Sequence, residues 1–309
     1  MTGTHNARTH LVERALAGRG WFGQEAPPAD AAPEEMEPPR PSWPVPIAHP
    51  APPAIPLARL HAAGMISAPH GPGRSKHLEE IALVQQQVLR QVDGSIAQGL
   101  AQAMAHEPAH GPAKARVVLI ASALPDEGKS FVALNLAASI AASGGRQALL
   151  VDADGRLGSI SAALGAADAP GLRDLAADPA LNAAPLVLPT ALERLSFLPY
   201  GTPSAAQKDM PSGSAMAAAV ARIAAALPGC VILLDPPPCL STSDAGALAA
   251  IAGQVVLVVD AQRTARNEVE AALDVLEACP VLQLLLNRVH LASNDSFGAH
   301  GDYGVPHAG

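Results

Sequence analysis

The chain has 309 residues, with 28 acidic and 20 basic side chains and a formal net charge of -8. A surface that binds nucleic acid needs clustered lysine and arginine, so this balance excludes a general nucleic-acid partner. The sequence has no run of about 18 apolar residues, and its N-terminus lacks the basic-then-apolar pattern of a signal peptide. We therefore expect a cytoplasmic chain that reaches the inner membrane only through a partner.

The N-terminal residues 1–56 predict a short helix followed by a disordered, proline-rich linker. Leu11, Ala15 and Leu16 would share one face of a helix over residues 9–19. Proline fixes φ and removes a backbone donor, so residues 23–56 favour polyproline II character over helix or sheet. This composition is typical of a plain spacer, and a ligand for a proline-binding domain is the alternative.

Residues 57–112 predict a helical extension. Apolar side chains recur near a 3.6-residue period from Ser75 to Ala105, and Gly94 weakens the pattern midway. The apolar positions are Leu78, Ile81, Leu83, Val84, Val88, Leu89 and Val92.

Residues 113–292 alternate apolar strand-like runs with helix-like stretches. The runs lie at residues 116–121, 148–151, 195–199, 231–234, 255–259 and 282–286. Strands that are apolar throughout and alternate with helices indicate a parallel sheet covered on both faces. We predict an α/β fold with a doubly wound, mostly parallel sheet, whose ligands lie at the carboxyl ends of the strands. Residues 293–309 would form a flexible tail.

Three cysteines, Cys230, Cys239 and Cys279, lack the paired spacing of a zinc site. We interpret them as small apolar residues in a reducing compartment.

The first strand runs into a loop that ends in Gly128-Lys129-Ser130 and then into a helix. This context is the one that a phosphate-binding loop requires, because backbone N–H groups at the helix N-terminus point at phosphate oxygens. Lys129 would reach the β and γ phosphates, and Ser130 would ligate Mg²⁺. Residues 126–131 are therefore the predicted nucleotide-binding loop, namely Asp126, Glu127, Gly128, Lys129, Ser130 and Phe131. A chance strand, loop and helix is the alternative.

Two acidic loops follow later strands. Asp152 and Asp154 end the second strand at positions i and i+2, where both carboxylates can face Mg²⁺ and one can accept a proton. Asp235 follows four apolar residues in the Walker B arrangement, which places a carboxylate beside the metal. Each aspartate alone would be better interpreted as a solvated strand-end residue.

With these motifs the chain resembles the bacterial tyrosine kinases (BY-kinases) of polysaccharide co-polymerase systems, in particular the tyrosine autokinases of exosortase/PEP-CTERM exopolysaccharide loci. The resemblance implies a P-loop NTPase with a deviant Walker A loop, in the MinD/ParA-like superfamily. It is carried by residues 57–65 and 122–138, the loop 152–156, Pro203, residues 235–237 and 253–259, and the segments 277–280 and 286–288.

The resemblance implies a role for each matching residue. Asp152 would be the catalytic carboxylate, supported by Lys129 and Asp154. Asp154 and Asp235 would organise Mg²⁺ with Ser130, and Asn287 would contact adenine, although asparagine is also common at strand ends.

ATP and Mg²⁺ are the implied cofactors. The γ-phosphate would pass to tyrosines in the C-terminal tail of a neighbouring subunit. The implied partner is a separate inner-membrane polysaccharide co-polymerase.

Four features depart from the family pattern. Asp126 stands in place of glycine, and Gly155 and Leu157-Gly158 replace a bulkier, basic continuation. Ala82 and Gln85 fill the places of the arginines that form the family's ring, which predicts at most a low-order homo-oligomer.

The tyrosine-rich tail of the family is reduced here to Tyr303. Tyr303 is therefore the predicted phosphoacceptor, because Tyr200 follows a strand and is expected to pack against the sheet.

Two other functions are open to the sequence. A non-catalytic, ATP-binding scaffold of the same system would explain the missing arginines and tyrosines. A MinD/ParA-type partition ATPase would need its signature lysine at the place of Leu124, and leucine cannot supply that charge.

Overall fold

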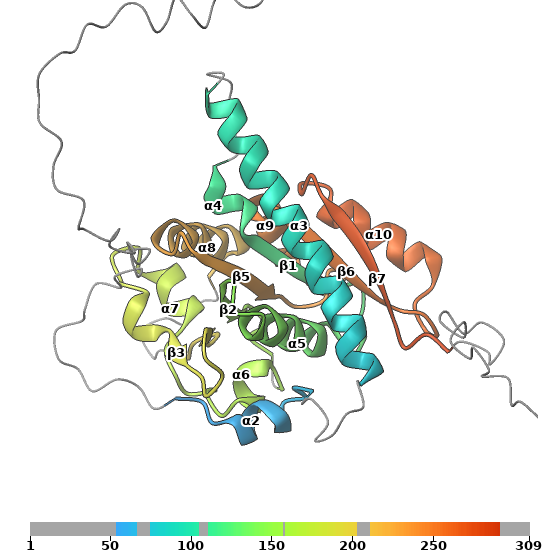
Figure 1. Cartoon of the computed structure of the whole chain (residues 1–309), viewed down its shortest axis with the longest axis horizontal. Helices are drawn as coiled ribbons and strands as arrows, with labels where there is room; N and C mark the ends of the chain where they lie inside the picture. Colours follow the sequence, from blue (N-terminus) through green and yellow to red (C-terminus); the bar gives the residue numbers. More distant parts are fainter. Residues whose placement is uncertain (1–53, 67–74, 105–110, 157, 203–210, 291–309) are drawn as a thin grey trace, which may run out of the picture. The chain divides into compact units, whose positions relative to one another are not determined.

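The computed structural model describes residues 54–66, 75–104, 111–156, 158–202 and 211–290 (Figure 1). All of these residues belong to one compact unit, Pro46–Gly309. The predicted helix over residues 9–19, most of the proline-rich linker and the tail with Tyr303 lie outside the described residues.

A seven-stranded sheet forms the centre of the described chain, with the strand order β3-β4-β2-β5-β1-β6-β7 (Figure 1). All neighbouring strands are parallel except the pair β3 and β4. The strands are β1 (Val117–Ser122), β2 (Gln147–Asp152), β3 (Leu188–Pro189), β4 (Leu195–Leu198), β5 (Cys230–Asp235), β6 (Gln254–Asp260) and β7 (Leu282–Asn287). The six predicted strands and the doubly wound sheet are confirmed, and β3 was not predicted.

Two apolar cores cover the two faces of the sheet, because successive strand residues point in opposite directions. Val117 and Leu119 of β1 belong to one core, and Val118 and Ile120 belong to the other. The first core is completed by α7 (Leu172–Ala177), α8 (Gly213–Ala226), α9 (Asp244–Ile251) and α10 (Arg266–Leu276). The second is completed by α2 (Leu57–Ala62), α3 (Lys76–Met104), α5 (Lys129–Ala142) and α6 (Ile160–Ala163). The short elements α4 (Pro112–Ala115) and η1 (Ala184–Leu186) precede β1 and β3, respectively.

Helix α3 confirms the helix predicted over residues 75–105 and continues through Gly94. Its stability comes from packing, since Val88 and Val92 are fully buried. Gln85 is buried too and accepts a hydrogen bond from the Ser139 hydroxyl of α5 at 2.5 Å. A position that carries arginine in the family therefore faces the neighbouring helix of the same chain. None of the described helices is long and apolar enough to cross a bilayer.

A strap over residues 54–66 joins the sheet to α5. Ile55 donates to the Pro189 carbonyl at 2.9 Å and accepts from the Ala191 amide at 2.8 Å. Further along, the Asn135 side chain of α5 donates to the Gly64 carbonyl at 3.0 Å and accepts from the Ile66 amide at 2.8 Å. The strap therefore belongs to the folded unit, although the sequence assigned Ile55 to the linker.

The three cysteines are buried and unpaired, as small apolar residues would be. Burial raises the pKa of Cys230 and of Cys239 to about 12, which keeps both thiols protonated.

Candidate functional site

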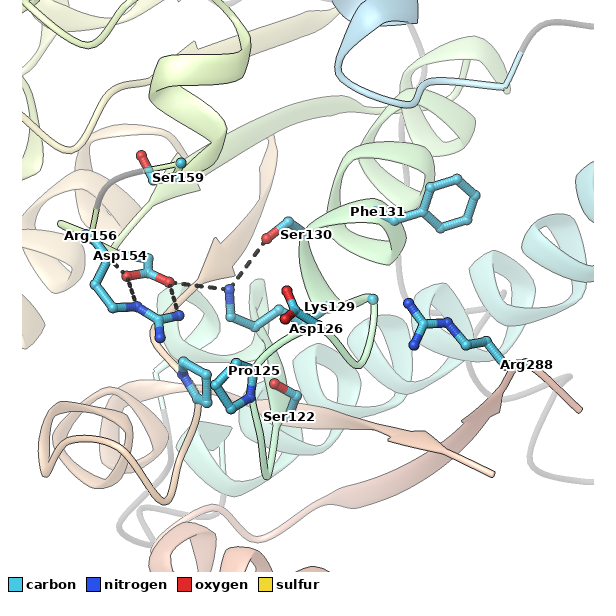
Figure 2. Close-up of a pocket in the computed structure, with 13 residues that line it drawn as sticks. Ser122, Pro125, Asp126, Lys129, Ser130, Phe131, Asp154, Arg156, Ser159 and Arg288 are labelled. Carbon is cyan, nitrogen blue, oxygen red and sulfur yellow. Dashed lines mark hydrogen bonds and ion pairs between the residues drawn. The ribbon is translucent and has the colours of Figure 1, made fainter. Parts of the chain in front are cut away.

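A cavity of about 400 Å³ opens beside the ends of β1 and β2, and Figure 2 shows its lining. Six of the predicted site residues line it: Asp126, Gly128, Lys129, Ser130, Phe131 and Asp154. The other lining residues were not predicted as site residues; they are Ser122, Pro125, Arg156, Gly158, Ser159, Pro238 and Arg288. In Figure 2, Phe131 and Arg288 lie at one side of the cavity and Arg156 with Asp154 at the other.

The loop before α5 takes two left-handed backbone steps. Asp126 has a φ of 63° and Gly128 a φ of 94°, and Gly128 is the residue from which α5 begins. Aspartate enters the left-handed region more readily than most residues. The loop can therefore keep its conformation with Asp126 at the position where the family has glycine. The turn brings the N-terminus of α5 to the cavity, where its free N–H groups suit phosphate oxygens.

Glu127 is turned away from the cavity, and its carboxylate fastens the loop to the protein. The Leu124 amide donates to Glu127 Oε2 at 2.7 Å, and the Thr264 hydroxyl donates to Oε1. Glu127 is only 3% exposed. The structure therefore leaves only the main chain of this predicted residue for a nucleotide, and the role of Thr264 was missed because it is 137 positions away.

Asn287 braces the same loop from the end of β7. Its side-chain amide donates to the Glu127 carbonyl at 2.9 Å. A Cβ atom on Gly128 would lie 2.3 Å from Asn287 Nδ2. The structure thus gives Asn287 a structural contact that sequence reasoning did not anticipate, and its contact with adenine stays a prediction.

Lys129 lies between the residues that the sequence assigned to Mg²⁺. Its ammonium nitrogen is 3.0 Å from Asp235 Oδ1, 3.5 Å from Asp154 Oδ2 and 3.3 Å from Ser130 Oγ. The side chains of Asp235, Asp154 and Ser130 all offer oxygen atoms, the ligands that Mg²⁺ prefers. Asp235 is 1% exposed, and neither of its oxygens accepts a hydrogen bond of normal geometry. A buried carboxylate with spare acceptor capacity fits a site that takes a divalent cation.

Asp154 is held by two cations. Arg156 Nε donates to Oδ1 at 2.9 Å and Nη2 donates to Oδ2 at 2.7 Å, which is a two-pronged contact. Burial opposes the charge of Asp154, but the hydrogen bonds from Arg156 and the charge of Lys129 outweigh it and lower the pKa. For Asp235 burial prevails over Lys129 and raises the pKa.

Asp152 is fully buried and does not line the cavity. Its carboxylate accepts from the Ser161 hydroxyl at 2.6 Å, the Ser161 amide at 2.9 Å and the Asp154 amide at 2.8 Å. Burial, and then the negative charge of Asp235, raise its pKa to about 6. The predicted catalytic carboxylate is therefore still largely ionised at pH 7, but it faces Ser161.

Tyr200 is buried beside this loop, which confirms the expectation that it packs against the sheet. A Cβ atom on Gly155 would lie 2.5 Å from two carbons of the Tyr200 ring. This contact explains why glycine stands at position 155, where the family has a bulkier residue. The ring of Tyr200 occupies the space that a larger side chain would need.

Comparison with known proteins places these residues in a family. No family model matches the chain. The chain is 31% identical over 196 residues to the tyrosine-protein kinase CpsD of Streptococcus agalactiae, covering 61% of this chain and 80% of that protein. The chain belongs to the bacterial tyrosine-protein kinases. The predicted family is thus confirmed.

Two longer relatives match this chain over only part of their own length. The putative tyrosine-protein kinase EpsB of Ralstonia nicotianae is 33% identical over 162 residues, covering 52% of this chain and 21% of EpsB. The succinoglycan biosynthesis transport protein ExoP of Rhizobium meliloti is 31% identical over 199 residues, covering 62% of this chain and 24% of ExoP. The chain therefore spans about a fifth to a quarter of these two relatives.

Among solved structures, the kinase domain of VpsO is similar with 27% identity and a TM-score of 0.48, covering 67% of this chain and 98% of that domain.

Proposed function

We propose that this kinase is an ATP-dependent protein-tyrosine autokinase that regulates exopolysaccharide biosynthesis or export together with a membrane co-polymerase. The observation that carries the proposal is the position of Lys129 between Ser130, Asp154 and Asp235 beside the N-terminus of α5. This combination suits phosphoryl transfer, which depends on positioning and on neutralising phosphate charge.

The proposed roles follow from these positions. N–H groups of the loop at residues 126–131 hold the phosphates, and Lys129 contacts the β and γ phosphates. Ser130, Asp154 and Asp235 would hold Mg²⁺, which when bound neutralises the charge on the transferred phosphoryl group. We further propose that Asn287 contacts adenine and that Phe131, which lines the cavity, contacts the nucleotide.

Transfer of the phosphoryl group to tyrosine releases one proton, which a base must accept. The tyrosine oxygen forms a bond to the γ-phosphorus, the bond to the bridging oxygen breaks, and ADP leaves. Asp152 takes the phenolic proton. Since Asp152 faces Ser161 in the described conformation, this role requires the loop after β2 to rearrange when substrate binds.

Tyr303 is the proposed acceptor, presented by a neighbouring subunit. The proposed assembly is monomeric or a low oligomer at micromolar concentration, because Ala82 and the inward-facing Gln85 cannot supply the ionic contacts of arginine. A stable octameric ring in light scattering would contradict this part.

The role in exopolysaccharide systems is supported by the relationship to ExoP, whose name describes succinoglycan transport. The partner would be an inner-membrane co-polymerase on a separate chain.

Peptide mass spectrometry after incubation with Mg²⁺ and ATP tests the proposal. We expect phosphate on Tyr303 in the parent and none in the Tyr303→Phe or Asp152→Ala proteins. Phosphate that persists in Tyr303→Phe removes the acceptor assignment. No phosphate in a parent that binds ATP favours a non-catalytic scaffold instead.

A further inference from the structure

Strand β7 lies at one edge of the sheet and carries three exposed leucines. Among the described strands it pairs with β6 alone (Figure 1). Leu282, Leu284 and Leu286 are 37%, 58% and 62% exposed, whereas Leu285 between them packs against the second core. Since side chains alternate along a strand, the three leucines share one face. The described part of the chain thus presents an apolar stripe along a sheet edge.

The outward main-chain groups of this edge belong to the same three leucines. The carbonyls of Val281 and Asn287 point the other way and accept from amides of β6 and of the residue after it, at 2.8 Å and 3.0 Å. Because the backbone of a pleated strand alternates, the residues between them at even positions direct their N–H and C=O groups away from β6. Edge groups of this kind are a template for a further strand.

The β7 sequence lacks the features that protect an edge strand from pairing. Such strands usually carry a lysine, a proline or a bulge that discourages a second strand. Residues 282–287 read Leu-Gln-Leu-Leu-Leu-Asn, without a charge or a proline. Each of them has its partner in an unbroken register with β6, so the strand has no bulge. This edge is therefore suited to receive another strand.

A second copy of β7 fits the edge. In an antiparallel pair centred on Leu284, this residue meets its own counterpart and Leu282 meets Leu286. All three outward-pointing residues then form hydrogen-bonded pairs, which recur at every second residue of an antiparallel ladder. The leucines of both copies lie together on one face, since residues opposite each other across two strands share a face. A two-fold axis produces this contact by using one surface twice.

The chain's own residues 291–309 match this edge less well. They include Gly298, Gly301 and Gly304, which weaken a strand, and Pro306, which removes a main-chain donor.

We propose that β7 is a homodimer surface, through which two copies of this chain pair antiparallel about Leu284 and bury their leucine stripes against each other. The contact goes beyond the proposed function, because it needs neither nucleotide nor phosphoryl transfer. A contact made by one six-residue strand per copy belongs at the low end of interface sizes, below about 1,200 Å². We therefore expect a dissociation constant in the micromolar range.

Sedimentation velocity of the full chain, without nucleotide and across the micromolar range, tests this inference. In the parent we expect an equilibrium between monomer and dimer. Leu284→Lys sets two positive charges opposite each other at the two-fold axis, and should raise the dissociation constant at least about tenfold. Leu100→Lys is the matched control, because Leu100 is a leucine of α3 that is 55% exposed. That control should associate as the parent does.

Cross-linking through introduced cysteines tests the register, since the three native cysteines are buried. A short bismaleimide should join Leu284→Cys into covalent dimers, because Cα atoms of a hydrogen-bonded antiparallel pair lie about 5.5 Å apart. It should not join Leu282→Cys to itself, because position 282 lies opposite position 286 and the two copies of 282 are on the order of 14 Å apart. A mixture of Leu282→Cys and Leu286→Cys should be joined again.

A parent that stays monomeric across the micromolar range would overturn the inference. Slow maleimide labelling of Leu284→Cys would then show that the chain's own tail covers the edge, and rapid labelling would show that the edge serves a different partner. A dimer that Leu284→Lys leaves unchanged, with the circular dichroism spectrum of the parent, would place the interface elsewhere and also contradict the inference. Failure of the proposed function would appear separately, as a chain that dimerises through β7 and gains no phosphate from Mg²⁺ and ATP.

Discussion

Asn287 and Gly128 fit together so closely that Asn287 Nδ2 lies 2.3 Å from where a Cβ atom on Gly128 would stand. Gly128 also has a φ of 94°, which other residues rarely adopt. The end of β7 thus fixes the shape of the phosphate-binding loop from 159 positions along the chain.

Gly128→Ala should therefore lose measurable ATP binding in calorimetry. The new methyl group must displace Asn287 and strain the backbone, which costs about 1–3 kcal/mol for the φ alone. Gly94→Ala is a matched control, because Gly94 is exposed in α3 and a Cβ atom there meets nothing within 4 Å. That control should keep ATP affinity and gain roughly 0.5–1 kcal/mol of stability. Equal ATP affinity in Gly128→Ala and the parent would show that the close contact does not shape the site.

Lys129→Met should abolish ATP binding, since Lys129 is the lysine within the loop that can neutralise the β and γ phosphates. The lost contact is worth about 1.5–3 kcal/mol before any effect on the metal. Calorimetry with Lys76→Met as the control measures the difference, and unchanged ATP affinity would refute the assignment of the loop.

Asp126 places a negative charge at the cavity, so Asp126→Asn should raise ATP affinity. We expect about a two- to fivefold gain, because a charge pair in water is worth up to about 1 kcal/mol. Asparagine also tolerates a positive φ, which keeps the loop conformation. Asp168→Asn, an exposed change elsewhere, is the control. Weaker binding of ATP by Asp126→Asn would mean that this aspartate assists the nucleotide.

A chain that begins at Ala54 should fold as stably as the full chain, whereas one that begins at Ile66 should be weaker. The second truncation removes Ile55 and the fully buried Leu60, each worth about 1.5–3 kcal/mol of burial. It also removes the Gly64 carbonyl from Asn135. Urea unfolding measures both proteins, and equal midpoints would show that the strap adds nothing to the folded unit.

The sequence predicted the sheet because its strands are apolar on both faces, as in the runs at residues 117–122 and 230–235. It missed β3, whose two residues have no recognisable period. The sequence predicted the site because its residues lie in loops that directly follow strands. What could not be predicted are the inward turn of Glu127 toward Thr264 and the pairing of Gln85 with Ser139, since both depend on contacts between distant segments. The contact of Arg156 with Asp154 is local, and its spacing of two residues was the available signal.

Intact-mass spectrometry of the purified chain, before and after incubation with Mg²⁺ and ATP, tests the assignment as an autokinase most directly. We predict that the parent gains the mass of a phosphoryl group and that the Lys129→Met protein does not. An unchanged mass in a parent that binds ATP would contradict the assignment and leave an ATP-binding scaffold.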